Sequence, residues 1–399
     1  MTPRLRDERG VALPLALMSL ALLLPLMLAF ASLSVSEPVI AGNQLRASQA
    51  RALADSGLEY ALWALSAPPD LGGLPSPLPD TPAPAPFDGR TFVTLGITGG
   101  FTVQVANHAG GDPQVRTIIA VGWADGKRAH RQVAGDAVAI PRPGARAPCA
   151  LCVRGALSVS GNVAIDGTNR DPACGDDAKY GTFTREATTV SGPAAITGGA
   201  GGAAEHQPAE AFETVTLSPA ALDALRAVAL RAGTYYGPGF PSGGLVSDGG
   251  ATWDGRITFG ASNSLPDGVV FIDATDGRNL EPGGATATLA GARLEAGAFA
   301  APDGVFRGWI VVNGALEIAA GLRVRGLVYA VDTLTARATE PGSIEGLVVA
   351  LNARDTGARI ETSAGGGVSI TFDCGLAGGA GLVPPGFTLI PGTYREERD

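Results

Sequence analysis

Residues 11–35, VALPLALMSLALLLPLMLAFASLSV, contain no charged side chain over their whole length. About 20 consecutive apolar residues are enough for a helix to cross the hydrocarbon core of a bilayer. A helix in a globular core normally carries a polar face, whereas the hydroxyl side chains here are limited to Ser19, Ser32 and Ser34. The sequence therefore predicts a membrane-embedded helix close to the start of the chain.

The residues that follow continue a helical pattern. In residues 44–65, QLRASQARALADSGLEYALWAL, apolar side chains recur near helical spacing with charged residues between them. We therefore expect one helix over about residues 11–66, apolar in its first half and amphipathic in its second, and roughly 80 Å long. Pro25 and Pro38 lack amide hydrogens, so we expect a bend at each, and Pro38 could also end the helix.

A family resemblance lies in this N-terminal part. A short charged leader that ends in Gly10, a long apolar helix and then residues 41–62, AGNQLRASQARALADSGLEYAL, resemble the N-terminal segment of the PilX family of type IV pilus assembly proteins. That family typically continues with a small-Asn-x3 segment and an Ala-Glu-Ser-Gly-like turn of helix, which read here as residues 41–43 and 54–59. The resemblance covers roughly the first 65 residues.

This resemblance implies a minor-pilin-like, non-enzymatic protein that is cut by prepilin peptidase between Gly10 and Val11. The helix would then stay in the mature protein and pack with other pilin-like subunits, for pilus assembly, priming or adhesion to a surface glycan or host ligand. One departure is Leu15, which stands where major pilins carry a Glu five residues into the mature chain. The alternative is an uncleaved signal anchor that holds an envelope or adhesive domain without a pilus role.

The basic residues around the apolar run indicate its orientation. Arg4, Arg6 and Arg9 precede the run, and the first basic residue after it is Arg46. By the positive-inside tendency, the N-terminus stays in the cytoplasm and the remaining chain crosses the inner membrane. We therefore expect a periplasmic body, later displayed on a pilus or at the cell surface.

The overall charge argues against nucleic acid as a partner. The formal net charge is -9, from 29 basic and 38 acidic residues, whereas phosphate binding needs a concentrated positive patch. The later cluster of Lys127, Arg128 and Arg131 is short, and the sequence alone predicts a solvated turn there.

Composition indicates a mainly β fold behind the helix. The chain contains 57 Gly and 29 Pro with 6% aromatic residues, and it is rich in Val, Ile, Leu and Thr. Residues 90–140 alternate with period two, and Asp125-Gly126 favours a tight hairpin. The expected organisation is a leader at 1–10, the helix at 11–66, a Pro-rich linker at 67–89, a small antiparallel β domain at 90–148, a β-helix-like domain at 149–375 and an exposed C-terminal tail at 376–399.

Internal repeats suggest the architecture of the largest domain. Residues 159–167 and 190–198 share Val, Gly, Ile and Gly at equal positions, and 324–330 match 344–350 twenty residues on. Short strands with Gly at their corners favour a β-helix or solenoid, loosely similar to bactofilins. The alternative is a β-sandwich with Gly-rich turns.

One helix is expected inside that domain, at 219–232. Ser218 is a good cap, Pro219 suits the first helical position, and Gly233 ends the pattern. We expect this helix to cover an open side or end of the solenoid and to hide its edge strands.

The cysteines are Cys149, Cys152, Cys174 and Cys374. Zinc needs four close ligands, and a thioredoxin-like site needs a βαβ unit, so neither chemistry is favoured. Outside the cytoplasm an even number of cysteines favours two disulfides. Three pairings are open, and we expect Cys374 to join the last coil to the first through Cys149 or Cys152.

Two further groups of residues invite chemistry. Asp166, Asn169 and Asp171 could contribute oxygen ligands to Ca²⁺, but with Asp176 and Asp177 they fit no calcium loop, and a solvated loop is favoured.

Glycoside hydrolysis would need two carboxylates at a defined separation, and a membrane-tethered carbohydrate-active β-helix enzyme is thus a second alternative. The residues that could serve it are Trp253, Asp254, Asp273 and Asp276. The histidines at 108, 130 and 206 form no metal or triad motif, and no GxSxG sequence is present. We expect neither an enzyme nor a cofactor.

Overall fold

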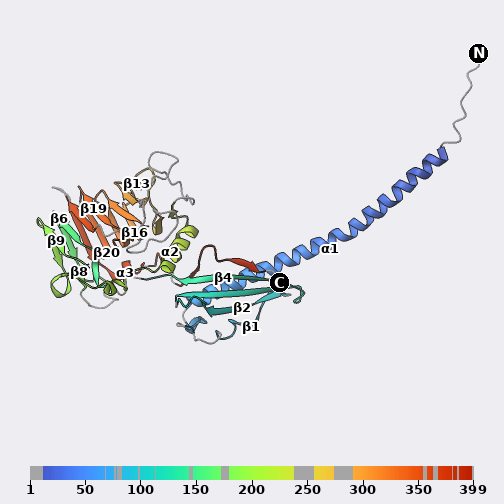
Figure 1. The fold of residues 1–399 in the computed structure, drawn as a ribbon, viewed down its shortest axis with the longest axis horizontal. Coiled ribbons are helices and arrows are strands. Elements are labelled where there is room, and N and C mark those ends of the chain that lie inside the picture. Colours follow the sequence, from blue (N-terminus) through green and yellow to red (C-terminus); the bar gives the residue numbers. More distant parts are fainter. Residues whose placement is uncertain are drawn as a thin grey trace, which may run out of the picture.

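The structure is a computed structural model. It describes residues 12–67, 69–75, 78, 83–97, 99–112, 114–142, 147–171, 179–237, 256–273, 291–353, 357–362, 367–379, 381–383 and 386–397. Figure 1 shows three parts in a row, namely a long helix, an antiparallel sheet packed on its second half, and a larger body of parallel strands. The expectation of a mainly β protein with an N-terminal apolar helix is confirmed.

The helix α1 spans Ala12–Ser66 without interruption. Pro25 and Pro38 both lie inside it, so Pro38 does not end the helix. A short 3₁₀ helix, Pro69–Leu71, follows. The part that leads from α1 to the first sheet, where the sequence predicts a linker, buries Leu74 and Phe87 against the core beneath α1.

The first sheet is an antiparallel meander in the order β1-β2-β3-β4. Its strands are β1 (Asp88–Leu95), β2 (Gly99–Asn107), β3 (Val115–Ala124) and β4 (Ala129–Ala139). Burial alternates along β2 and β3, as period-two strands with one covered face require. Asp125 and Gly126 both take positive φ in the β3–β4 turn, which is the geometry of a tight hairpin.

The C-terminus returns to this first sheet. Strands β23 (Phe387–Leu389) and β24 (Arg395–Glu397) both pair with β4 in antiparallel fashion. The tail expected over residues 376–399 therefore forms strands here, of which β23 is partly buried and β24 is mostly exposed. The physical reason is that the Phe387 and Leu389 side chains pack against the core beneath α1, so the segment covers the free edge of β4.

The larger body contains two sheets of parallel strands. One sheet has the order β10-β7-β22-β20-β18-β16-β14-β12, with β5, β8 and β11 attached beside β20, and the other has the order β13-β15-β17-β19-β21-β6-β9. The strands are β5 (Cys149–Val153), β6 (Leu157–Ser160), β7 (Val163–Asp166), β8 (Tyr180–Thr184), β9 (Thr188–Ser191), β10 (Ala195–Thr197), β11 (Ala203–Ala204), β12 (Tyr235–Tyr236), β13 (Arg256–Phe259), β14 (Gly268–Asp273), β15 (Gly291–Leu294), β16 (Val305–Asn313), β17 (Ala315–Ile318), β18 (Arg323–Ala330), β19 (Leu334–Ala338), β20 (Gly342–Ala350), β21 (Ala358–Thr362) and β22 (Val368–Phe372).

From β13 to β22 the chain alternates between these two sheets, one strand in each. The sequence repeats become neighbours in register, because residues 324–330 of β18 pair one for one with residues 344–350 of β20. Likewise Val159 pairs with Val190, and Ile165 pairs with Ile196. Equivalent residues of the sequence repeats therefore occupy equivalent positions on neighbouring strands.

The order of strands in the body is not the order in the chain. The early strands β6 and β7 lie against the late strands β21 and β22. Between the early and the late strands the chain forms short 3₁₀ helices at Gly199–Gly201 and Ala209–Phe212 and the helix α2 at Pro219–Ala232. A last short helix, α3 (Cys374–Ala377), follows β22.

The helix α2 is capped at both ends. The Ser218 hydroxyl accepts a hydrogen bond from the Ala221 amide at 3.2 Å, and Gly233 ends the helix with φ of 71°. The helix packs beside β12 and β14, at one end of the larger sheet, and it also touches β4 and β23. Ala224 of α2 forms a small core with Val115 and Val138 of the first sheet, and this core joins the two bodies.

Candidate functional site

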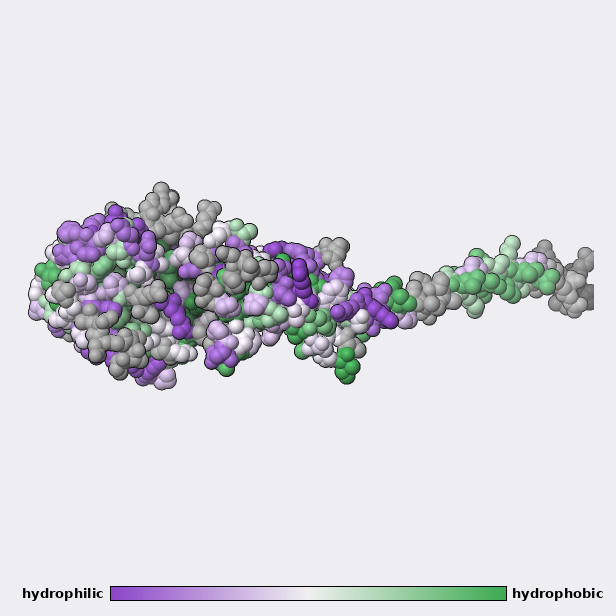
Figure 2. Space-filling model, turned by 90° about the horizontal axis from the view of Figure 1, so that it is seen from below, coloured by the Kyte–Doolittle hydropathy of each residue, from purple (hydrophilic) through white to green (hydrophobic). Residues whose placement is uncertain are grey.

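The first half of α1 is exposed although it is apolar. Residues 13–30 form a helix that is long and apolar enough to cross a membrane, by length and composition, and none of that window is buried in the protein. Figure 2 shows it as a largely hydrophobic rod that projects from the body. Leu15, at the position where the resemblance expects Glu, is 64% exposed. An exposed apolar surface of this length is typical of a segment that contacts lipid or another protein.

The second half of α1 packs on the first sheet. Ala54, Leu58 and Ala61 are buried there, with β2, β3 and β4 as the main partners. Gly122 of β3 permits a close approach, because a Cβ at this position would overlap the backbone of α1 at Ala50. One helix therefore combines a free apolar half with a half that is fixed to the body.

The proposed cleavage point cannot be placed on this helix. Gly10 and Val11 lie outside the described residues. The described helix starts at Ala12, immediately after them.

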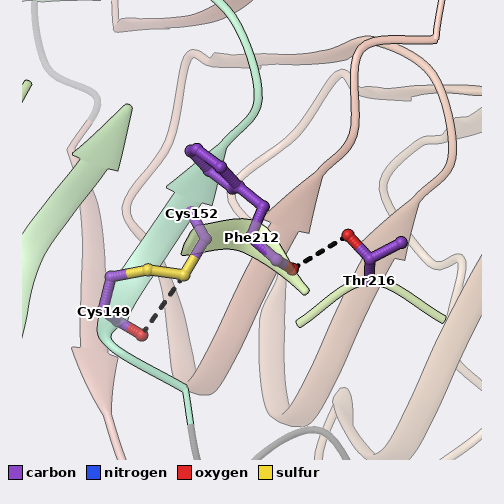
Figure 3. The surroundings of a disulfide bond; sticks show 4 residues. All are labelled: Cys149, Cys152, Phe212 and Thr216. Atoms are coloured by element: carbon purple, nitrogen blue, oxygen red, sulfur yellow. Dashed lines mark hydrogen bonds between the residues drawn. A yellow bond between two sulfur atoms is a disulfide. The ribbon is translucent and has the colours of Figure 1, made fainter. Parts of the chain in front are cut away.

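Cys149 and Cys152 form a disulfide within β5, with their Cα atoms 5.7 Å apart. Figure 3 shows this bond beside Phe212, whose carbonyl oxygen accepts a hydrogen bond from the Thr216 hydroxyl at 2.9 Å. Both cysteines are fully buried, so the bond lies inside the core.

The expectation that Cys374 bonds to Cys149 or Cys152 is therefore wrong. Cys374 is itself disulfide-bonded, and Cys174 lies outside the described residues. The physical reason is position, because the amide of Cys374 donates to the Asn169 side chain at 3.2 Å, next to the Asp166–Asp171 loop rather than to β5.

The candidate calcium ligands make hydrogen bonds within their own loop. Asp166 accepts a hydrogen bond from the Thr168 amide at 2.9 Å, and Asn169 donates to the Asp171 carbonyl at 2.8 Å. Partial burial acts to raise the pKa of Asp166, but hydrogen bonds from Thr168 and Thr197 and the charge of Arg170 together outweigh it and lower that pKa. Within the described residues no three His, Cys, Asp or Glu side chains come together as a metal site.

Asp273 lies at the centre of a buried polar cluster that the sequence did not reveal. Its carboxylate accepts hydrogen bonds from Arg226 Nε at 3.1 Å, from the Tyr235 hydroxyl at 3.2 Å and from Asn313 Nδ2 at 2.8 Å. Burial, and then the negative charge of Asp273, raise the pKa of Tyr235. Arg226 belongs to α2 and also pairs with Asp223, so the cluster fixes α2 to the larger sheet.

Three of the other residues considered for catalysis are not placed by the structure. Trp253, Asp254 and Asp276 lie outside the described residues. Of the histidines, His108 Nδ1 lies 3.5 Å from Asp136 Oδ1 in the first sheet, and the His130 ring is tilted against Trp123 with ring centroids 4.9 Å apart. No signal in the sequence pointed to the Asp273 cluster, because the residues that hydrogen-bond to Asp273 lie 38 to 47 positions away from it along the chain.

Comparison with known proteins finds similarity among solved structures. No protein-family model matches the chain. No curated protein matches it. The crystal structure of the competence-associated pilin ComZ from Thermus thermophilus is similar at 12% identity, covering 88% of this chain and 98% of that chain, with a TM-score of 0.23. A TM-score of this size does not establish a shared fold.

Proposed function

We propose that the protein is a minor-pilin-like, PilX-like component of a type IV pilus system and that it is not an enzyme. The observation that carries this proposal is the division of α1 into an exposed apolar half and a half packed on an antiparallel meander. A rod of this kind is stored in the inner membrane and then exchanges lipid for the apolar helices of other pilin-like subunits. The N-terminus is cytoplasmic and the body periplasmic until the protein joins a pilus or the cell surface.

The body supports a position at low copy number. We propose that its parallel strands form a β-helix, and the support is the alternation between two sheets with repeats in register. A body of this size would clash if it were stacked at every subunit of a filament. A tip position suits priming of assembly, or adhesion to a surface glycan or host ligand.

The absence of enzymatic activity is part of the proposal. Asp273, one of the carboxylates considered for glycan cleavage, is fully buried and accepts hydrogen bonds from Arg226, Tyr235 and Asn313. A carboxylate in this position serves structure rather than proton transfer to a sugar.

The test is the mature N-terminus. Mass spectrometry of the protein from its native host should give a chain that begins at Val11. Replacing Gly10 with Phe should leave the leader attached and reduce piliation, because prepilin peptidase needs a small residue at the cut. Gly42→Ala is the matched control, since nothing lies within 4 Å of a Cβ at Gly42, and it should be processed normally.

Unchanged processing of Gly10→Phe would remove the pilin proposal and leave the signal-anchored envelope or adhesive protein. The carbohydrate-active alternative would instead require that the protein cleaves a glycan. It would further require that Asp276→Asn abolishes this cleavage.

A further inference from the structure

A basic cleft lies where α1 leaves the body. It has a volume of about 380 Å³ and is formed between α1, the β3–β4 turn and the start of β4. Its lining residues are Asn43, Arg46, Ala47, Asp125, Arg128, Ala129, His130 and Arg131. Figure 2 shows hydrophilic residues gathered at this point, beside the hydrophobic rod.

The cleft carries excess positive charge. Three arginines face one aspartate, and Arg46 already pairs with that aspartate, Asp125, at 3.0 Å. Arg131 lies 3.6 Å from Glu396 of the C-terminal strand β24. Arg128 makes no ion pair within the described residues, and the next residue back, Lys127, lies over the Phe92 ring at 4.4 Å. An anion is therefore the natural occupant of the cleft.

The cleft faces the membrane side of the body. Arg46 follows Phe30, the end of the spanning window, by 16 residues, which is roughly 24 Å of helix. Between them Val39 and Ile40 are still apolar and exposed. From Ile40 to Arg46 is roughly 9 Å, compared with roughly 5 to 8 Å for the headgroup layer of one leaflet.

An apolar turn lies at the same end. In the β1–β2 turn Leu95 is 48% exposed and Ile97 is fully exposed. Because Gly100 of β2 pairs with Trp123 of β3, this turn lies beside the β3–β4 turn. Basic side chains next to an exposed aliphatic side chain are typical of surfaces that bind a lipid interface.

We infer that this end of the body docks on the bilayer that α1 spans, with the cleft holding the phosphate of an anionic lipid headgroup and Ile97 entering the interface. The inference rests on the proposed membrane anchoring of α1. It assigns the Lys127–Arg128 turn, which the sequence alone predicts to be merely solvated, a role in orienting the body before assembly.

The test uses the full chain in vesicles of phosphatidylcholine, with or without phosphatidylglycerol. Ile97→Cys carries an environment-sensitive fluorophore, and the cysteines that the structure describes, Cys149, Cys152 and Cys374, are all disulfide-bonded. A lipid-borne quencher should quench this label, and more strongly when phosphatidylglycerol is present. Val190→Cys is the matched control, because Val190 is an exposed aliphatic residue of β9, in the parallel body, and its label should remain unquenched.

Charge reversal at Arg128 of the cleft and at the adjacent Lys127 tests the role of positive charge. A basic residue near an anionic surface contributes about fivefold to binding. Lys127→Glu with Arg128→Glu should therefore lower the ratio of docked to undocked body by roughly 25-fold or more. Quenching at position 97 should then no longer respond to phosphatidylglycerol.

The outcomes separate the two proposals. A chain that fails to float with either kind of vesicle contradicts the anchoring of α1 itself. If the chain floats with the vesicles but the label at position 97 is not quenched, or its quenching does not depend on phosphatidylglycerol, only the docking is overturned. Inorganic phosphate that abolishes the lipid dependence without releasing the label would make the cleft a free phosphate site. Quenching that depends on the number of protein molecules per vesicle, and not on lipid composition, would make this end of the body a contact between copies. A free phosphate site or a contact between copies would each overturn the docking.

Discussion

Gly308, Gly326 and Gly346 lie in line across β16, β18 and β20, each with positive φ. A Cβ at Gly326 would overlap the carbonyl oxygen of Gly308 on the neighbouring strand. Gly326→Ala should therefore lower the free energy of unfolding by about 3 kcal/mol, since it adds both a strained φ and a backbone clash. Chemical denaturation measures this loss. Gly381→Ala, at a positive φ with open space, should cost less, and equal losses would contradict the role of strand stacking.

The Asp273 cluster gives a second prediction for a single residue. Asp273→Asn removes the buried carboxylate that accepts from Arg226, whose side chain is only 12% exposed. We expect a loss of about 3 kcal/mol in the free energy of unfolding, because a buried charge then lacks its partner. Thermal unfolding measures this loss. A loss no larger than that of a surface ion pair would show that the pairing with Asp223 is enough to stabilise the Arg226 charge.

Asp303 supplies the surface control and a dependence on pH. Hydrogen bonds from Arg307 lower the pKa of Asp303 to about 2. A carboxyl whose folded pKa lies below its unfolded value of about 3.9 stabilises the fold above that value, and the contribution is lost as pH falls toward 2. The melting temperatures of wild type and Asp303→Asn should therefore differ slightly at neutral pH and converge between about pH 4 and 2. A gap that persists at pH 2 would contradict this pairing.

Sequence reasoning at the residue scale succeeded where a local rule applies. The Ser218 cap, the Gly233 end and the Asp125-Gly126 hairpin each depend on neighbours within a few positions. The Asp273 cluster and the Cys149–Cys152 bond depend on which strands lie side by side, and only the three-dimensional arrangement decides that.

Among whole elements, α1 and β3 come into close backbone contact at Gly122. Gly122→Ala would place a methyl group against the backbone of α1 at Ala50 and Ala54. We expect α1 to be pushed from the sheet, with a loss of about 2 kcal/mol or more in the stability of the first sheet. Hydrogen exchange of β3 amides measures it. Gly42→Ala, in the open part of α1, should be neutral or stabilising by up to about 1 kcal/mol.

Some of these elements could be predicted from the sequence and others could not. The long helix and the meander follow from periodicity alone, and both are present. The C-terminal strands were missed because residues 387–397 are short, rich in charge at their end and paired to a strand some 250 positions earlier. Such distant pairing leaves no local pattern to read.

At the scale of the whole molecule, the order of strands in the two parallel sheets differs from their order along the chain. The early strands β6 and β7 stack on the late strands β21 and β22, so neither the early nor the late segment completes its sheets alone. The repeats indicated stacking, but they could not show where the first strands would join, since parallel strands of equal pattern fit in several orders.

The protein has two large hydrophobic cores, with a small cluster of buried residues, the joint, between them. One core lies beneath α1, the other fills the parallel body, and Ala224 meets Val115 and Val138 between them. A joint of this size should not couple the two cores strongly, so calorimetry of the detergent-solubilised chain should resolve two transitions. Gly122→Ala should lower the transition of the first core alone, and Gly326→Ala that of the second alone.

Ala224→Glu provides the third variant of that experiment. A buried carboxylate at the joint should loosen the contact between the bodies while leaving both transitions near their original temperatures. Small-angle scattering would then report a broader distribution of overall dimensions. A single transition that all three variants shift together would mean that the joint transmits stability between the bodies. The body would in that case be presented rigidly on α1 rather than through a joint that can bend.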